Sequence, residues 1–213
     1  MIYPLPLSNF WFEIGKSRAS FGLPSAANLS RTHGGEITTA LLGSRLWTIN
    51  VTLAFENNDD AVAVQSTLRM LVNPGASFLA SPILRRTPKS DVHGSVLGRT
   101  VTIGSLPAGS ETLGLSGLQP GYIISKGDYV SWVVAGIYHI HQFGVSGQAD
   151  ASGVLAALDV VPPIRSDAAT GQVVSLVDAT MKAVIDPSTL NEGSFGSAIT
   201  SGMTFTAIQT LRA

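Results

Sequence analysis

The chain has 213 residues, enough for one large domain or two small ones with a sizeable hydrophobic core. Hydrophobic residues make up 45% of it, charged residues only 13%, and the mean hydropathy is +0.30, a balance typical of membrane proteins or of subunits buried against neighbours. The net charge of −1 and the scattered basic residues argue against a nucleic-acid-binding protein, and the lack of cysteine excludes disulfides, thiolate metal sites and a cysteine nucleophile.

The first third of the chain contains one clear strand pattern. Residues 1–8 lack a basic region and include Pro4 and Pro6, so we expect no signal peptide and a protein made in the cytosol. Residues 10–14 are a short strand candidate. Residues 47–55 alternate between an apolar face and a polar one, which predicts a half-buried strand; the apolar face holds Trp47, Ile49, Val51, Leu53 and Phe55.

One helix is predicted at about residues 59–72. The residues at 57–60, Asn-Asn-Asp-Asp, supply capping side chains and negative charge for its first turn. Apolar residues then recur at helical spacing, and Asn73-Pro74-Gly75 ends the segment. The helix is amphipathic, with Ala61, Val64, Leu68 and Leu71 on one side, and we expect it to cover one face of a sheet.

The region from 96 to 165 differs from its surroundings. Gly- and Ser-rich turns separate short strand candidates, including 101–103, 137–143 and 154–161, and the region closes on Pro162-Pro163-Ile164-Arg165. About 70 residues with roughly five short strands fit a small OB-like barrel. We therefore predict an inserted barrel at 96–165 within a larger β-rich domain formed by 1–95 and 166–213.

The last segment returns to strand patterns at 173–177, 181–185 and 203–211, the last with alternating apolar and Thr residues. The predicted fold class is mainly β, a β-sandwich or barrel domain with one amphipathic helix and an inserted OB-like barrel. The most continuous apolar run, Tyr129 to Ile140, has about twelve residues, whereas a spanning helix needs roughly 18–20. We therefore expect no membrane insertion, and the low charge then indicates subunit interfaces.

Catalytic motifs are not evident. Gly15-Lys16-Ser17 resembles the end of a phosphate loop, but the glycine required five positions earlier is replaced by Phe10, and no serine has the Gly-x-Ser-x-Gly context of a nucleophile elbow. Asp59 and Asp60 are explained by helix capping. A hydrolase would need a pair of carboxylates, for which the few glutamates are the candidates: Glu13, Glu36, Glu56, Glu111 and Glu192. We predict no enzyme activity, no catalytic residues and no cofactor.

His139 and His141 are the strongest metal candidates. Side chains two positions apart in a strand share a face, so both imidazoles could reach one ion. A third ligand would have to come from elsewhere in the chain, and Asp128, Asp150 and Asp159 are candidates. Ile137 and Phe143 fall on the same face, however, which favours a core or interface role. We therefore predict no metal site.

Several segments of the C-terminal half resemble one family in their order. They are Lys126-Gly-Asp-Tyr129, Tyr138-His-Ile-His-Gln142, the small-residue turn at 147–153, Pro162-Pro-Ile-Arg165, Met181-Lys-Ala-Val-Ile-Asp-Pro187 and the closing strand at 200–212. This order is similar to that of the distal tail, or tail-tip hub, proteins of long-tailed bacteriophages. The N-terminal half matches that family only in its order of elements.

The resemblance implies a structural virion protein. Such subunits form a ring, a hexamer in the family, that joins the tail tube to the tip or baseplate hub, with the barrel on the outside of the ring. It implies tail tube and hub proteins as partners, assembly in the host bacterial cytoplasm, and a final location at the tail tip. A closed ring uses heterologous, rather apolar interfaces, which suits the low charge of this chain.

Two other functions stay open from the residues. A carbohydrate-binding module, contacting a host surface glycan through the barrel, would expose aromatic side chains in a cleft, and Tyr122, Tyr129 and Trp132 are the first candidates. A hydrolase would show paired carboxylates with displaced pKa values. Against the first, all three tryptophans lie in strand-like patterns, where a core role is expected.

Overall fold

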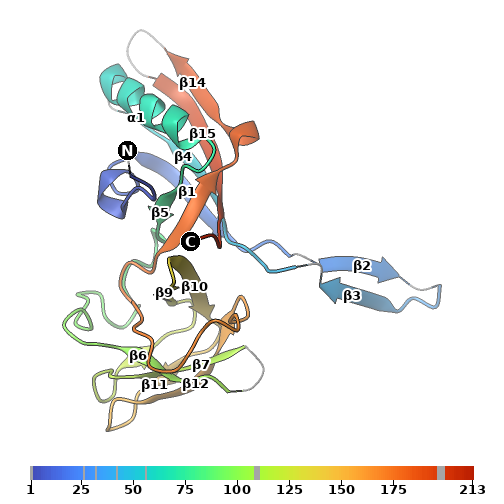
Figure 1. Ribbon diagram of the computed structural model, residues 1–213, viewed down its shortest axis with the longest axis vertical. Coiled ribbons are helices and arrows are strands. Elements are labelled where there is room, and N and C mark those ends of the chain that lie inside the picture. The colour runs from blue at the N-terminus through green and yellow to red at the C-terminus, as the bar shows by residue number, and fades with distance from the viewer. Residues whose placement is uncertain are drawn as a thin grey trace.

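The computed structural model describes residues 2–25, 27–31, 33–41, 43–55, 57–107, 111–195 and 200–213. This part of the chain is mainly β-structure with a single α-helix, as the sequence predicts. Figure 1 shows two lobes stacked along the long axis, with a two-stranded hairpin that projects sideways from near their junction. The chain passes from the first lobe into the second and then returns, so both ends of the sequence build the first lobe.

The first lobe is built on a six-stranded antiparallel sheet. Its strands follow the order β1–β4–β15–β13–β5, and β14 pairs with β15 beyond the end of β13. Their bounds are β1 Lys16–Gly22, β4 Thr48–Leu53, β5 Phe78–Ala80, β13 Met181–Ile185, β14 Asn191–Phe195 and β15 Thr200–Gln209. The central strand β15 comes from the C-terminal end of the chain, so the sheet is complete only when both ends have come together.

One face of this sheet carries the first hydrophobic core. The predicted alternation in β4 is confirmed, because Ile49, Val51 and Leu53 are buried while the residues between them are less so. In β15, Met203 and Phe205 face the same core. The helix α1 (Asn58–Leu71) packs Leu68 and other side chains of its buried side against this face. Burying an aliphatic side chain of this size is worth about 1.5–3 kcal/mol, so this contact holds the helix on the sheet.

The start of α1 is as the sequence predicts. Asn57 adopts an extended conformation, and its side-chain oxygen accepts a hydrogen bond of 2.8 Å from the N–H of Asp60. Asp59 and Asp60 place negative charge in the first turn, where the helix dipole favours it. The helix ends before Gly75, whose φ of +85° belongs to the left-handed region open to glycine.

The segment before β1 corrects one prediction. Residues 10–14, expected to be a strand, form turns after the short 3-10 helix η1 (Leu7–Asn9). Phe10 and Trp11 nevertheless lie in the first core, where their rings pack against Phe78 at centroid distances of 5.0 and 6.1 Å. The apolar residues of this segment are buried, as their pattern indicates, but the backbone that carries them forms a turn and not a strand.

The second lobe is a small barrel. A five-stranded antiparallel sheet has the order β6–β7–β12–β10–β9, with bounds β6 Thr102–Ser105, β7 Thr112–Ser116, β9 Tyr129–Val134, β10 Ile137–Phe143 and β12 Leu155–Val161. A two-residue pair, β8 (Ile123–Ile124) and β11 (Gly147–Gln148), lies beside it. Its interior holds a second hydrophobic core, to which Trp132, Phe143 and Leu115 contribute.

A segment outside the regular strands closes this barrel. Val173 bridges to Thr102 of β6, and Ser175 bridges to Ser131 of β9, so the stretch at 172–175 joins the two edges of the sheet. Val174 and Leu176, which follow residue 165, pack in the second core together with Val96. The strand predicted at 173–177 is thus present only as these isolated bridges, and its function is to complete the barrel.

The two lobes touch through a small set of buried contacts. Ile140 of β10 packs into the first core, and its carbonyl accepts a hydrogen bond of 3.1 Å from the indole N–H of Trp47. The side chain of Gln209, at the end of β15, accepts from the N–H of Trp47 and donates to the carbonyl of Tyr138. Trp47 and Gln209 therefore fix β10 of the barrel against the end of the first sheet.

The projecting hairpin consists of β2 (Ala27–Arg31) and β3 (Ile37–Leu41), which pair only with each other. Figure 1 shows it extending away from both lobes. Among the described residues, no helix is long and apolar enough to span a membrane.

Candidate functional site

The two histidines singled out by the sequence lie in the barrel next to the junction of the lobes. His139 and His141 are both 2% exposed, and both imidazole rings stack on the indole of Trp132 in the neighbouring strand β9. The ring centroids lie 5.7 and 4.6 Å from that of Trp132, with interplanar angles of 15° and 7°. The histidines therefore form one stacked layer with a core tryptophan, which supports the core or interface role that Ile137 and Phe143 indicated.

The environment of each ring keeps it neutral near pH 7. The Nδ1 atom of His141 lies 2.7 Å from the carbonyl oxygen of Pro162, so this nitrogen carries the proton of the neutral ring. Burial lowers the pKa of His141 to about 4. Burial also lowers the pKa of His139, against the opposing field of Asp167, whose Oδ2 lies 3.2 Å from His139 Nε2 without hydrogen-bond geometry.

The aspartates proposed as a third metal ligand lie elsewhere. Asp128 is fully buried and accepts hydrogen bonds from the N–H groups of Lys89 and Ser125. Asp150 holds a turn by accepting from Ser152 and Val154, and Asp159 is exposed on β12. Within the described ranges, no group of three or more His, Asp or Glu side chains is placed to hold a metal ion.

The aromatic residues proposed as a sugar platform are also packed. Trp132 lies in the barrel core, and the Tyr122 hydroxyl donates a 3.0 Å hydrogen bond to the buried carboxylate of Asp91. Tyr129 is half-buried and packs on Trp47 at a centroid distance of 5.6 Å. Two of the three rings are buried and the third is only partly exposed, so they do not form an open aromatic platform for a sugar ring. All three tryptophans are buried, as the sequence predicts.

The candidate carboxylates are scattered over the molecule. Glu13 precedes β1, Glu36 lies at the tip of the hairpin, and Glu111 precedes β7. Glu192 of β14 forms a surface ion pair with Arg69 of α1, with a second bond from Gln65. Glu56 lies outside the described residues.

Lys16 of the phosphate-loop-like triplet has a local structural role. Its ammonium group lies 4.7 Å from the centroid of the Trp11 ring and donates to the carbonyls of Trp11 and Ile14. Burial lowers the pKa of Lys16 to about 8. Because the ammonium group caps the turn that precedes β1, it is not directed at an open anion site.

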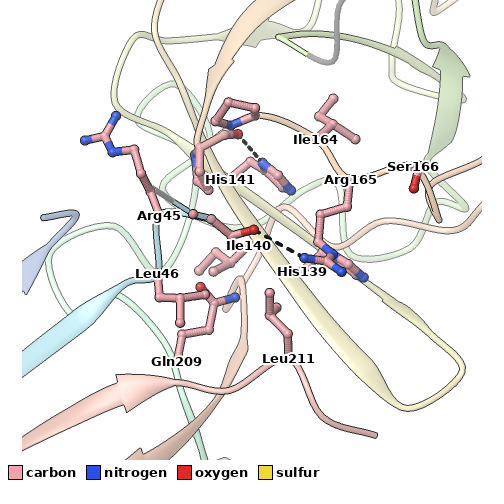
Figure 2. A pocket seen from close by; sticks show the side chains of 14 residues that line it. Arg45, Leu46, His139, Ile140, His141, Ile164, Arg165, Ser166, Gln209 and Leu211 are labelled. Atoms are coloured by element: carbon pink, nitrogen blue, oxygen red, sulfur yellow. Dashed lines mark hydrogen bonds between the residues drawn. The ribbon is translucent and has the colours of Figure 1, made fainter. Parts of the chain in front are cut away.

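A cleft lies between the lobes, beside the two histidines. It has a volume of about 470 Å³ and is lined by Gly43–Leu46, His139–His141, Pro162–Ser166, Gln209 and Leu211. Figure 2 shows Arg45 on one side of the cleft and Arg165 with His139 on the other, with Leu46, Gln209 and Leu211 between them. The lining has apolar walls and two guanidinium groups, and none of the described residues that form it is Asp or Glu.

The hairpin presents the second candidate surface. Its register pairs Leu29 with Thr39 and Arg31 with Ile37, so Leu29 and Ile37 lie on the same face of the ribbon. Their side chains are 66% and 53% exposed. Asn28 and Thr38 belong to the opposite face. This face of the hairpin therefore carries two apolar side chains that the described part of the chain leaves largely uncovered, together with Arg31 and Thr39.

The outer face of the first sheet is the third candidate surface. The register places the side chains that alternate with the core residues of β1, β4, β15 and β13 on this face. They are Arg18, Ser20, Thr48, Asn50, Thr52, Thr204, Thr206, Ile208, Lys182 and Val184, each at least partly exposed. Only Arg18 and Lys182 are charged in this set. The face is thus mostly polar but weakly charged, and depletion of charge is one property that it shares with the centres of protein interfaces.

Sequence patterns could not find the cleft, because its walls come from four distant segments of the chain. Sequence patterns missed Asp167 for the same reason, since it lies beyond the predicted barrel range of 96–165 and meets His139 only in the folded chain. The comparisons with known proteins add no assignment: neither a family model nor a curated protein matches this chain.

Proposed function

We propose that this protein is a structural virion subunit of a bacteriophage tail tip, which forms a ring between the tail tube and the tip or baseplate hub. The observation that carries the proposal is the projecting hairpin, because it is an arm on which the described part of the chain leaves Leu29 and Ile37 largely uncovered. The family resemblance of the C-terminal half supplies the location in the tail. On this proposal the protein is not an enzyme and needs no cofactor.

The arm requires a partner on physical grounds. An isolated two-stranded hairpin is marginally stable in water at best, and β2 and β3 pair only with each other. Leu29 and Ile37 are 66% and 53% exposed, so covering the exposed part would contribute about 1–2 kcal/mol for each side chain. A second copy of the chain is the partner we favour, since an arm on one subunit and a receiving surface on the next form a heterologous contact that closes into a ring.

The outer face of the first sheet supports the same proposal. It is wide, weakly charged and not covered by the helix, which packs on the opposite face. Subunits of a ring need two different contact surfaces, and the arm and this sheet face are two such surfaces on one chain. The number of subunits, six in the family, comes from the resemblance alone, as do the tail tube and hub partners and the tail-tip location.

The carbohydrate-binding alternative gains no support from its named candidates, since Tyr122, Tyr129 and Trp132 are packed within the protein. A glycan contact through the outer surface of the barrel remains compatible with a ring subunit.

The test combines the mass of the purified protein with images of the particles. Light scattering of the wild type should give a multiple of 22.2 kDa, and electron microscopy should show closed rings with a central hole. The double variant Leu29→Asp, Ile37→Asp should weaken assembly by roughly a hundredfold or more, because it replaces two apolar contacts by two charges.

The matched control is Asn28→Asp, Thr38→Asp. It adds the same charge at the same diagonal spacing on the opposite face of the hairpin, so it should assemble like the wild type. A wild-type protein that stays monomeric, both alone and with tail tube protein, would contradict the proposal. If the two double variants assemble equally well, the hairpin does not form the contact between subunits.

A further inference from the structure

The cleft between the lobes contains a guanidinium group with spare donors. Arg165 has one hydrogen bond within the described part of the chain, to Ser44 Oγ, and at 3.4 Å this bond is long. Arg69 and Arg86, in contrast, each make a two-pronged contact with a carboxylate, Glu192 and Asp178 respectively. Arg165 thus has the free planar donor edge that bidentate carboxylate recognition uses.

The second guanidinium group of the cleft, that of Arg45, adds positive charge but does not fill the cleft. Arg45 donates to the carbonyls of Leu23 and Pro24, which hold its head group at the side of the cleft. The imidazoles of His139 and His141 are neutral near pH 7, and the described lining offers no carboxylate to balance the two guanidinium groups. Asp167, which follows the lining residue Ser166, lies against His139 with 3.2 Å between its Oδ2 and the imidazole Nε2. The cleft is therefore positive.

The remaining walls favour an apolar group. Leu46, Ile140, Ile164 and Leu211 line the cleft together with two prolines. Its volume of about 470 Å³ lies within the range of small-molecule sites, roughly 300–1,000 Å³. Hydrogen bonds also fix the positions of the wall residues. His141 is hydrogen-bonded to the carbonyl of Pro162, and Gln209 is hydrogen-bonded to Trp47 and Tyr138.

We propose that this cleft binds a carboxylate carried on an apolar body, with the carboxylate on Arg165 and the apolar part against Leu46, Ile164 and Leu211. The Ser44 hydroxyl, which accepts from Arg165, keeps its own proton free to donate to the same carboxylate. Two sources share this chemistry: a free organic acid, and the C-terminal carboxylate of a polypeptide that ends in an apolar residue. The inference does not depend on ring formation.

The experiment is ligand-observed saturation-transfer NMR on the full chain, which works for a monomer and for a large ring alike. The probes are benzoate and its neutral counterpart benzamide, and N-acetylphenylalanine with its neutral amide. We expect both acids to bind saturably in the millimolar range or below, since ligands this small bind weakly, and the neutral counterparts to bind at least tenfold more weakly. Tighter binding of N-acetylphenylalanine identifies a polypeptide end, and tighter binding of benzoate a free acid.

Two arginine variants assign the site. Arg165→Gln should weaken binding of the acids by about tenfold or more, because a hydrogen bond to a charged group is lost. Arg99→Gln removes the same charge from an exposed position of the second lobe outside the cleft and should leave binding unchanged. Ser44→Ala, a smaller change, should weaken binding in the same direction. Equal binding of acids and neutral counterparts, or an Arg165→Gln protein that binds like Arg99→Gln, would overturn the proposal, whatever the oligomeric state.

Discussion

The buried carboxylate of Asp91 organises the loop that leads into the barrel. It accepts hydrogen bonds from the N–H groups of Ser95 (2.7 Å) and Val96 (3.0 Å) and from the hydroxyl of Tyr122 (3.0 Å). Val96 and Tyr122 both belong to the second hydrophobic core. One side chain therefore connects the irregular loop to the barrel interior.

Replacing Asp91 by Ala should be strongly destabilising. Three hydrogen bonds disappear, and their donors lose a buried partner. With about 1 kcal/mol for each bond, and more where a charged acceptor is involved, the free energy of unfolding should fall by about 3–4 kcal/mol. This is a large part of the roughly 5–15 kcal/mol by which domains are stable. Tyr122→Phe removes only the hydroxyl and should cost about 1 kcal/mol.

Urea unfolding followed by tryptophan fluorescence measures these changes. Asp150→Ala is the matched control, since Asp150 also accepts from two N–H groups of its own turn but on the surface, and it should have a much smaller effect. In the double variant of Asp91 and Tyr122, the effects should not add, because both changes remove the same bond. A loss below 1 kcal/mol for Asp91→Ala would refute the reasoning.

The contribution of Asp91 should also depend on pH. Burial raises the pKa of Asp91, but its hydrogen bonds outweigh burial, and the pKa lies below the ordinary value. The folded state therefore favours the charged form, so the stabilisation is present above the unfolded pKa of about 4 and is lost as the pH falls through the folded pKa. The difference between wild type and Asp91→Ala should accordingly shrink below about pH 4.

The remaining expectations concern a buried base and a glycine. Burial lowers the pKa of His141 to about 4, so the unfolded chain binds the proton first as the pH falls. The free energy of unfolding should therefore fall by about 3 kcal/mol as the pH drops from about 6.5 to 4. His141→Gln should flatten this slope in urea unfolding, and an unchanged slope would contradict the reasoning. Gly153→Ala should destabilise by at least about 1 kcal/mol more than Gly171→Ala in thermal unfolding. Both glycines have positive φ, but only at Gly153 would a Cβ atom meet a backbone oxygen, 2.2 Å away at Leu118, so equal losses would contradict this reasoning.

Local periodicity accounts for the elements that could be predicted from the sequence. The strands β4 and β13 and the helix α1 each bury a regularly spaced set of side chains, so their patterns report both the element and its buried side. In β10, by contrast, the consecutive residues His139, Ile140 and His141 are all buried, because one side faces the barrel core and the other faces the first lobe. The same logic misread residues 10–14, where Phe10 and Trp11 are buried from a turn. Apolar residues indicate burial reliably, but a short run of them does not determine the backbone conformation.

The hairpin was missed for the opposite reason. The residues of β2 are mostly exposed, and Leu29 and Ile37 are its clearest apolar signal. Because neither face of the hairpin is buried by the described part of the chain, its sequence lacks the strong alternation of apolar and polar residues that predicts a strand. Its register, which brings Leu29 and Ile37 to one face, follows from the cross-strand pairing.

The sequence by itself determined a mainly β protein with one capped amphipathic helix, few charges and buried tryptophans, because composition and short-range spacing are sufficient for these properties. Only the tertiary structure decided that the stretch at 172–175 closes the barrel, that the arm projects from the body, and that Ser44, His141 and Arg165 line one cleft. These features depend on contacts between residues far apart in the chain, and such contacts leave no periodic pattern in the segments that make them.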